Sequence, residues 1–536
     1  MRPLLLSVPV LLTLWLAAPA AQQPPRLIVI AVADQFRADY LTTFSSHWRG
    51  GLKTLLDEGA VFRRAEYPYR HTDTCAGHFT IGTGTLPRTH AMIADAWWDP
   101  ETRLNIECTD DDKAQPVTYG AVSKRGKSGR RLLVPTLADE LRSQKPGSRV
   151  VSLSLKSRSA IGLAGHGGDA VTWFDETLGV GSFVTSTAFS RTPVAAVKAF
   201  VDRDPFEKEF TQLWTLRDPE GQYRSADAGV GERPRAPRIG LFPHVMKGLT
   251  DNRNDAFSLW RESPFGDAYL GRMAIALVDA FGLGQRAGTD FLGIGFSSTD
   301  TVGHPFGPDS RELEDTVARL DDALRALILH LDTKVGRDNY VLAFSADHGV
   351  APIPVTMGGG AVASEDVRER IEVIMTRHFG TAGTRWVIAG GSQPRLADGA
   401  MAKLVARPAV LAEVERAVQS IPGVERLLRT DTLSEASRDP LVRMAALSHV
   451  PGRSGDFVIV PKRNWLIAGR TGLAGTGHGS PYEYDRHVPL ILLGGGIKAG
   501  RYDRAATPAD IAPTLAKVAN VMLPKAEGRV LTEALR

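Results

Sequence analysis

The chain has 536 residues, 43% of them hydrophobic, with 64 lysines and arginines against 60 aspartates and glutamates and a net charge of +4. This length exceeds the about 250–300 residues at which one hydrophobic core stops growing, so we expect a large core with added subdomains. The scattered basic residues argue against nucleic-acid binding, and the two cysteines exclude a disulfide-rich scaffold and a thiolate-rich metal site.

The N-terminal residues have the pattern of a secretory signal peptide. Arg2 gives a basic start, the run from Leu4 to Leu16 is almost entirely apolar, and small residues follow. The apolar run is shorter than the about 20 residues that span a bilayer, so we expect cleavage near Ala20 or Ala21 rather than a retained anchor. No later run is apolar enough to span a membrane. We expect a mature catalytic domain of residues 22–536 that is periplasmic or secreted.

Buried strands alternate with amphipathic helices along the mature chain. The expected strands are Arg26 to Ala33, Ser148 to Leu155, Asp290 to Phe296, Tyr340 to Phe344 and Val488 to Leu493. The expected helices are Gly51 to Gly59, Pro135 to Gln144, Gly271 to Phe281, Glu312 to Leu331 and Thr507 to Val518. This alternation indicates an α/β fold whose central sheet is mostly parallel and flanked by helices.

Two segments interrupt the alternation and predict insertions. Residues 204–255 are rich in proline, arginine and aspartate without clear periodicity, and indicate a cap. Residues 352–461 form a mixed block with helices expected near Glu365 to His378 and Leu411 to Gln419. We expect both insertions to shape the cleft over the sheet.

Acidic residues and histidines follow several of these strands. Asp34 follows the first strand, and Asp347 and His348 follow the strand that begins at Tyr340. Asp300 and His304 come after the strand ending at Phe296, with a four-residue spacing that puts both on one side of a helical turn. In open α/β sheets the carboxyl ends of the strands face one ligand crevice.

His478 lies in a glycine-rich loop before the last expected strand, which leaves its ring free to point inward. Each of these residues alone is explained as a helix cap or a hydrogen-bonded histidine. Together they supply three carboxylates and three imidazoles at four strand ends. Oxygen and nitrogen donors of this kind suit two zinc ions.

The longest informative motif is Tyr67 to Asp99, which reads YPYRHTDTCAGHFTIGTGTLPRTHAMIADAWWD. Shorter motifs accompany it at Asp34 to Arg37, Ser345 to Gly349 and Gly477 to Gly479. Together they resemble the alkaline phosphatase superfamily. Within it, the resemblance is to the bacterial branch with a threonine nucleophile, which is similar in its core to nucleotide pyrophosphatases/phosphodiesterases. It covers the whole mature core and implies an alkaline-phosphatase-like fold.

The resemblance implies the role of each site residue. Asp300, His304 and His478 would bind one Zn2+, whereas Asp34, Asp347 and His348 would bind the other, together with Thr74. Thr74 would be the nucleophile, because a nearby metal ion activates an otherwise poor hydroxyl. Thr74 would become phosphorylated, and water would release phosphate in a second displacement. A threonine before Cys75 also suits a helix cap, and a helix N-terminus favours a phosphoryl anion.

Lys156 and Arg158 are the candidate anion clamp. Both continue the strand that ends near Leu155, so we expect them to project on the same side. A guanidinium and an ammonium can bind the non-bridging oxygens of a phosphate dianion, although two such residues also suit a solvated strand end. In the threonine-type phosphatases this pair resembles the feature that favours monoesters.

Asp95, 21 residues after Thr74, departs from the family pattern, which has an asparagine that donates to a phosphoryl oxygen. An ionised aspartate cannot donate, and at ~4 Å it would repel a unit charge by about 4 kcal/mol. Three arrangements are open: a pair with Lys156 or Arg158, a protonated carboxyl, or a shift of preference toward diesters or another anion. We expect the pair, with weakened monoester affinity and appreciable diesterase activity.

The function we expect is hydrolysis of small-molecule phosphate monoesters. The alternatives are a phosphodiesterase or nucleotide pyrophosphatase that uses the same metals, and a non-catalytic binding homologue. A sulfatase is disfavoured, because Cys75 to His78 lacks the context of a formylglycine precursor. Cys75 and Cys108 would pair in an oxidising compartment or remain free; the sequence leaves this open.

Overall fold

The computed structural model describes residues 23–120, 125–175, 181–235, 240–247, 253–381, 383, 385–469 and 475–536. The expected signal peptide, residues 1–21, lies outside these described residues. None of the helices in the described part of the chain combines the length and the apolar composition needed to cross a bilayer.

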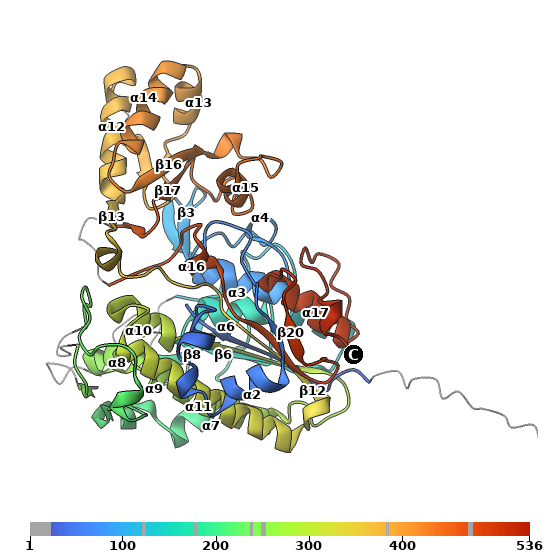
Figure 1. The fold of residues 1–536 in the computed structure, drawn as a ribbon. Helices are drawn as coiled ribbons and strands as arrows, with labels where there is room; N and C mark the ends of the chain where they lie inside the picture. Colours follow the sequence, from blue (N-terminus) through green and yellow to red (C-terminus); the bar gives the residue numbers. More distant parts are fainter. Residues whose placement is uncertain are drawn as a thin grey trace, which may run out of the picture.

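A ten-stranded sheet forms the centre of the molecule (Figure 1), in the order β20-β2-β19-β12-β1-β11-β6-β7-β8-β5. Its strands are β1 (Leu27–Ala33), β2 (Ala60–Phe62), β5 (Pro116–Thr118), β6 (Val150–Ser154), β7 (Ala170–Asp175), β8 (Ser182–Ser186), β11 (Asp290–Phe296), β12 (Tyr340–Ser345), β19 (Leu490–Gly494) and β20 (Gly500–Tyr502). The central strands β12, β1, β11, β6 and β7 are parallel to one another. β19 and β8 run antiparallel to their neighbours. The expected α/β fold with a mostly parallel sheet is confirmed.

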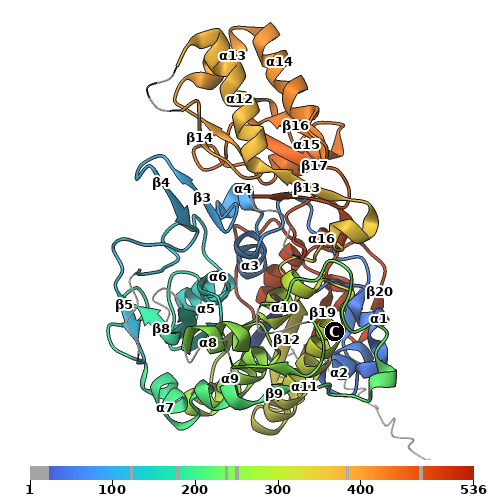
Figure 2. The ribbon, with the colours of Figure 1, turned by 90° about the vertical axis from the view of Figure 1, so that its left-hand side faces the viewer.

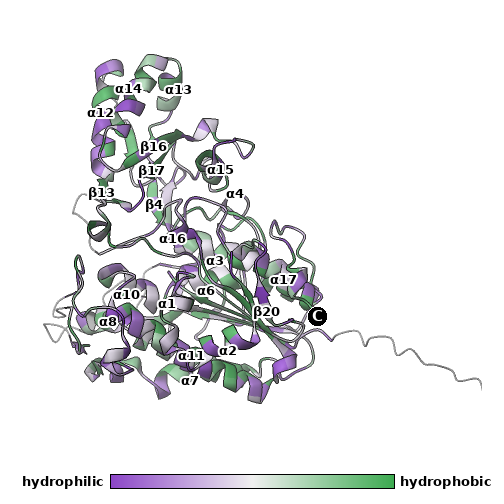
Figure 3. Ribbon diagram, viewed as in Figure 1, coloured by the Kyte–Doolittle hydropathy of each residue, from purple (hydrophilic) through white to green (hydrophobic). Residues whose placement is uncertain are grey.

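Both faces of the sheet are covered by helices, which explains why its central strands are mostly apolar and buried on both sides. All seven residues of β1 are buried, and alternate residues belong to two separate hydrophobic clusters. One face carries α2 (Gly51–Glu58), α7 (Ala195–Arg203), α9 (Phe265–Phe281) and α11 (Arg311–Lys334). The other carries α3 (Thr74–Thr83), α5 (Leu137–Gln144), α6 (Ser157–Ala164) and α17 (Ile511–Val518). Figure 3 shows the sheet as largely hydrophobic between helices of mixed polarity.

The sequence located these elements well but misplaced some of their ends. α9 begins at Phe265, before the expected Gly271. Its N-cap residue is Pro264, a residue that favours the start of a helix. β6 ends at Ser154, and α6 starts at Ser157. Lys156 and Arg158 therefore lie at the start of a helix and not on a continued strand, so the strand-based expectation for this pair is wrong.

The first expected insertion packs beside α11. It contains a short antiparallel pair of β9 (Leu213–Trp214) and β10 (His244–Val245), and it leads into α8 (Arg253–Arg261). The Trp214 indole donates to Asp315 of α11 at 2.6 Å, which ties the segment to the helix. This insertion therefore covers the helical layer on one face of the sheet.

The second insertion forms a separate lobe with its own hydrophobic core (Figure 2). Its elements are β13 (Gly360–Ala363), α12 (Ser364–Phe379), β14 (Val387–Ala389), β15 (Arg395–Leu396), α13 (Ala400–Val405), α14 (Pro408–Gln419), β16 (Val424–Arg429), α15 (Pro440–Ala446) and β17 (Phe457–Pro461). β18 (Trp465–Ala468) pairs with β13, so the lobe extends past the expected boundary at 461. A hairpin of β3 (Ala96–Asp99) and β4 (Leu104–Glu107) stands beside it (Figure 2).

Candidate functional site

The candidate metal ligands gather at the carboxyl ends of neighbouring parallel strands. Asp34 follows β1, Asp347 and His348 follow β12, and Asp300 lies on α10 (Ser298–Phe306), which follows β11. These strands are adjacent in the sheet, in the order β12-β1-β11, so the residues after them share one crevice. His478 reaches this crevice from the loop that precedes α16 (Glu483–Arg486).

The candidate ligand atoms form two groups, and within each group all atoms lie within 4.8 Å of one another. One group consists of Asp34, Asp347 and His348, and the other of Asp300, His348 and His478. His348 thus belongs to both groups, whereas the sequence placed it in one. His304 lies at the edge of the second group, with its Nε2 3.0 Å from Asp300 Oδ1. The structure therefore brings together all six residues expected to bind metal.

The three histidines are oriented in the same way. The Nδ1 atoms of His304, His348 and His478 lie 2.8–2.9 Å from the backbone carbonyls of Thr476, Gly349 and Thr72. A neutral imidazole that donates from Nδ1 keeps a lone pair on Nε2, which is the tautomer that binds a metal ion. Each Nε2 points to a carboxylate, at 3.0–3.8 Å. The carbonyls therefore fix the ring orientation that a metal site requires.

Two buried carboxylate oxygens at the site accept no well-directed hydrogen bond from the described residues. Asp34 Oδ1 and Asp347 Oδ2 are inaccessible to solvent, and the His78 Nδ1 atom that lies 3.1 Å from Asp347 Oδ2 does not form a hydrogen bond with it. Burial and the nearby Asp347 carboxylate raise the pKa of Asp34 well above its usual value. Uncompensated buried carboxylates are costly unless they coordinate a cation. These orphaned atoms, together with the nitrogen and oxygen donors around them, fit divalent metal ions.

Lys156 connects the two groups of ligands. Its Nζ lies 2.7 Å from Asp34 Oδ2 and 2.5 Å from Asp300 Oδ2. Burial acts to lower the lysine pKa, but the carboxylates of Asp300 and Asp34 hold it above its ordinary value. Lys156 therefore stays a cation at the centre of the site, where an anionic substrate would meet it.

Thr74 is the first residue of α3 and is buried beside the ligands. Its Oγ1 lies 3.5 Å from His348 Nε2. The N-cap residue of α3 is Asp73, whose side chain makes no capping bond, so Thr74 is not the helix cap. A Cβ on Gly77 would lie 2.2 Å from the Asp347 carbonyl oxygen, so only glycine lets α3 approach this backbone. Close contact between α3 and the residues after β12 thus delivers the hydroxyl to the ligands.

Asp95 and Arg158 form an ion pair near Thr74. Arg158 Nε lies 2.9 Å from Asp95 Oδ2, and the backbone N–H of Cys75 donates to Asp95 Oδ1 at 2.8 Å. Of the three arrangements expected for Asp95, the structure contains the ion pair, with Arg158 and not with Lys156. The Asp95 carboxylate is thereby held at the N-terminus of α3, where it partly neutralises the positive charge of Arg158.

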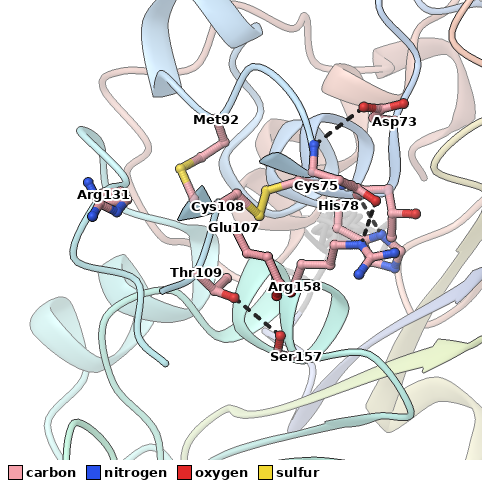
Figure 4. The surroundings of a disulfide bond; sticks show 12 residues. Asp73, Cys75, His78, Met92, Glu107, Cys108, Thr109, Arg131, Ser157 and Arg158 are labelled. Atoms are coloured by element: carbon pink, nitrogen blue, oxygen red, sulfur yellow. Dashed lines mark hydrogen bonds and ion pairs between the residues drawn. A yellow bond between two sulfur atoms is a disulfide. The ribbon is translucent and has the colours of Figure 1, made fainter. Parts of the chain in front are cut away.

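Cys75 and Cys108 form a disulfide that ties this region together (Figure 4). The bond joins the residue after Thr74 to the residue after β4. The backbone N–H of Cys108 also donates to the Asp95 carbonyl at 2.9 Å. The disulfide therefore connects α3, Asp95 and the β3–β4 hairpin at one point.

Several residues near the site were not predicted from the sequence, although they belong to the motifs quoted above. His78 Nδ1 lies 3.0 Å from the Thr74 carbonyl oxygen and 3.1 Å from Asp347 Oδ2. His71 Nε2 lies 2.9 Å from Asp73 Oδ2. Gln35 donates from Nε2 to Asp300 Oδ1 at 2.7 Å. The spacing of four between Thr74 and His78 was a usable signal, because it places both on one face of a helix.

Two buried carboxyls support the loops that carry the ligands. Asp267 accepts hydrogen bonds from the backbone N–H groups of Ser297 and Ser298, at the start of α10. Asp485 accepts from the N–H of Ser480, two residues after His478. Burial raises the pKa of each of these carboxyls to about 7. They hold the backbone on either side of the crevice.

A cleft of about 510 Å³ opens near the start of α3. Asp73, directly before Thr74, and His71 line it, the β3–β4 hairpin forms one wall, and residues 388–393 of the inserted lobe form the other. The cleft thus lies between the core and the lobe.

Comparisons with known proteins agree with this arrangement. A family model described as type I phosphodiesterase / nucleotide pyrophosphatase matches residues 27–485. Alkaline phosphatase PhoV of Synechococcus elongatus is 32% identical, covering 96% of this chain and 93% of that protein. Alkaline phosphatase PafA of Elizabethkingia meningoseptica is 32% identical, covering 95% and 94%.

A crystal structure of wild-type alkaline phosphatase PafA has a TM-score of 0.88 to this chain at 32% identity, and covers 96% of this chain and 100% of its own. Both the sequence and the fold are therefore matched over nearly the full length. The chain belongs to the type I phosphodiesterase / nucleotide pyrophosphatase family, within the alkaline phosphatase superfamily, and is a phosphoric ester hydrolase.

Proposed function

We propose that this protein hydrolyses phosphate monoesters with two zinc ions and a phosphothreonine intermediate at Thr74. The observation that carries the proposal is the position of Thr74, buried at the N-terminus of α3 with its hydroxyl 3.5 Å from His348 Nε2. His348 belongs to both groups of ligand atoms. A hydroxyl at this point is within reach of cations held by either group.

The six ligand side chains would hold the two metal ions. Asp34, Asp347 and His348 suit one ion, and Asp300, His304 and His478 suit the other, with His348 close to both. Two bound zinc ions would supply Lewis-acid stabilisation of the attacking and leaving oxygens of an in-line displacement. The family similarity and the orphaned oxygens of Asp34 and Asp347 support this assignment.

Thr74 would attack phosphorus from one side while the ester oxygen leaves on the other. The new bond joins Thr74 Oγ1 to phosphorus, and the bond from phosphorus to the organic oxygen breaks. Water then attacks the phosphothreonine in a second displacement, which returns the threonine hydroxyl and releases phosphate. The N-terminus of α3, which has ten residues, favours the negative charge of the phosphoryl group at this position.

Lys156 and Arg158 support a preference for monoesters. A monoester carries a dianionic phosphoryl group, and Lys156 lies between the two ligand groups, where it can neutralise that charge. A crystal structure with a TM-score of 0.87 to this chain is of a PafA variant altered at a threonine, an asparagine 21 positions later, and a lysine and arginine two positions apart. Thr74 and Asp95 have the first spacing here, and Lys156 and Arg158 the second.

Phosphodiester hydrolysis is the second candidate function, and the pair of Asp95 with Arg158 favours it. The carboxylate shares the positive charge of Arg158 and adds a negative charge near the phosphoryl position. Repulsion from that charge acts more strongly on a dianion than on a monoanion. Asp95 therefore weakens the discrimination that Lys156 and Arg158 provide.

The test is kcat/KM for a phosphate monoester and a diester of the same chromogenic alcohol, measured on the zinc-loaded protein. We expect turnover of both, with the monoester preferred, and loss of turnover in Thr74→Ala. Thr333→Ala, an exposed threonine at the end of α11, is the matched control and should keep full activity. A zinc-loaded protein that hydrolyses neither ester would favour a non-catalytic binding protein.

We also propose that the protein is exported to the periplasm or secreted. The basic, apolar and small-residue pattern of residues 1–21 supports this, and so does the disulfide, because such bonds persist in oxidising compartments. Cell fractionation with N-terminal sequencing of the mature protein tests it. A cytoplasmic protein that retains Met1 would contradict it.

A further inference from the structure

The β3–β4 hairpin presents one face to the core and the other to the cleft beside the nucleophile. Trp97 pairs across the hairpin with Ile106, and both are buried in the core, although Trp97 also borders the cleft. Trp98 pairs with Asn105, and both line the cleft. Because directly paired residues share a face of a two-stranded sheet, the Trp98 ring and the Asn105 amide stand side by side.

The cleft-facing pair has polar atoms with no partner. Trp98 is half-buried, and its indole N–H donates to none of the described residues. Asn105 is exposed, and its side-chain amide makes no hydrogen bond within the described chain. Trp97, in contrast, is covered by the Arg453 guanidinium, 5.2 Å from its ring centroid. Trp98 therefore offers a free ring face bordered by hydrogen-bonding groups.

The cleft is also placed to receive the organic part of a bound ester. Its lining includes Asp73, directly before Thr74, and Ala94 and Ala96, on either side of Asp95. An ester with phosphorus at Thr74 would have its organic group directed to solvent or into this cleft. The opposite wall is formed by Ile388, Gly390 and Gly391 of the inserted lobe, whose strand β14 stands above the β3–β4 hairpin in Figure 2.

We propose that this cleft is a subsite for the organic group of the ester, and that it selects planar aromatic groups by stacking them on Trp98. The Asn105 amide and the Trp98 indole N–H would meet polar atoms at the edge of the ring. Ile388 would contact the other ring face from the inserted lobe. The inference rests on the proposed monoester hydrolysis, because it assumes that phosphorus is bound at Thr74.

The charges of the cleft suit a neutral ring. Arg395 and Arg453 line it, but both are engaged: Arg395 donates to Gly452 and Ser454 carbonyls, and Arg453 donates to Ala91 and Arg131 carbonyls. Asp73 at the inner end is paired with His71. Since these charges have partners already, apolar contact and ring stacking remain as the main sources of selectivity.

The experiment compares three phosphate esters. Benzyl phosphate has a planar ring, cyclohexylmethyl phosphate has a ring of similar size that is not planar, and methyl phosphate has no ring. An aromatic pair contributes about 0.5–1.5 kcal/mol beyond its area burial. We therefore expect Trp98→Ala to lower kcat/KM for benzyl phosphate about 3- to 10-fold, with less than a twofold change for methyl phosphate. Trp98→Phe should retain most of the preference for benzyl over cyclohexylmethyl phosphate.

Leu104→Ala is the matched control, because Leu104 is an exposed residue of the same hairpin that does not line the cleft. It should change none of the three rates. Ile388→Ala tests the opposite wall without altering the hairpin and should lower the benzyl rate selectively. Equal changes on all three esters in Trp98→Ala, or no change, would overturn the subsite while leaving the proposed function intact. A protein inert to every ester would contradict the proposed function itself.

Competitive inhibition gives a second readout that does not depend on turnover of each ester. Benzylphosphonate should inhibit the wild-type protein more tightly than methylphosphonate, and Trp98→Ala should remove most of that difference. If both phosphonates inhibit wild type equally, the cleft does not bind the ring.

Discussion

Arg158 Nε lies 2.9 Å from Asp95 Oδ2, so the Arg158 guanidinium near Thr74 is paired with a carboxylate. The other oxygen of Asp95 accepts the backbone N–H of Cys75 at 2.8 Å. The carboxylate is thus fixed from two sides, between the N-terminus of α3 and the start of α6. Its position determines how much positive charge Arg158 can offer to a phosphoryl group.

Replacement of Asp95 by asparagine should raise the preference for monoesters. The amide removes one negative charge, releases Arg158 and can donate to a phosphoryl oxygen, a gain of about 1.5 kcal/mol for a charged hydrogen bond. We expect kcat/KM for a monoester to rise about tenfold relative to a diester of the same alcohol. Asp112→Asn, which breaks an exposed pair with Arg130, is the control. An unchanged ratio in Asp95→Asn would refute this role.

His348 and His304 should differ in their effect on metal content. His348 belongs to both groups of ligand atoms, whereas His304 belongs to neither, contacts only Asp300 among the candidate ligand carboxylates, and is partly exposed. We expect elemental analysis after dialysis to find nearly two zinc ions in the wild type, about one in His304→Ala and fewer than one in His348→Ala. Equal zinc loss in both variants would contradict the shared position of His348.

The disulfide should stabilise the fold and the nucleophile together. Cys75 and Cys108 are separated by 33 residues, and closing a loop of this length stabilises a protein by roughly 3–4 kcal/mol in the chain-entropy model. The double variant Cys75→Ala/Cys108→Ala should lose about this much in urea unfolding. Its kcat/KM should also fall, because the bond holds the start of α3, which carries Thr74, against the β3–β4 hairpin. Unchanged stability after complete reduction with dithiothreitol would contradict the prediction.

His90 should make the fold sensitive to acid. Burial and the nearby Arg453 lower the pKa of His90 to about 3. Its Nδ1 accepts the backbone N–H of Met92 at 3.0 Å, and its Nε2 lies 3.1 Å from the Thr80 hydroxyl. Protonation would place a second N–H against the Met92 donor. The neutral ring is therefore required by the fold.

The sign of the effect follows from proton binding. Below about pH 6.5 the unfolded chain binds a proton at His90 that the folded chain does not, so stability falls with falling pH. Between pH 7 and pH 5 this amounts to about 2 kcal/mol of the free energy of unfolding. His90→Asn keeps an acceptor for the Met92 N–H. Between pH 7 and pH 5 its free energy of unfolding should therefore fall by about 2 kcal/mol less than that of the wild type. Identical pH profiles for wild type and His90→Asn would refute the assignment.

The sequence predicted the sheet and the grouping of the candidate metal ligands, because both follow from local patterns. The strand Asp290–Phe296 is uncharged after Asp290, is buried throughout and matches its expected bounds. The acidic residues and histidines after the strands had to share one crevice once the sheet was parallel. Asp300 and His304 form the expected contact on one side of a helical turn.

The remaining features depend on distances between segments that periodicity does not encode. The end of β6 at Ser154 moved Lys156 and Arg158 onto α6, where Lys156 faces Asp34 and Asp300 while Arg158 faces Asp95. The sharing of His348 between two groups required three loops to be placed at once. The pairing of Cys75 with Cys108 required the β3–β4 hairpin to return to α3.

The measurement that tests the central claim most directly is the site of phosphorylation during turnover. Zinc-loaded protein is mixed with a phosphate monoester, quenched in acid and analysed by peptide mass spectrometry. We predict one phosphoryl group on the peptide that contains Thr74, and none in Thr74→Ala. Steady turnover of the monoester with no phosphoryl group on Thr74, or undiminished turnover in Thr74→Ala, would contradict the account.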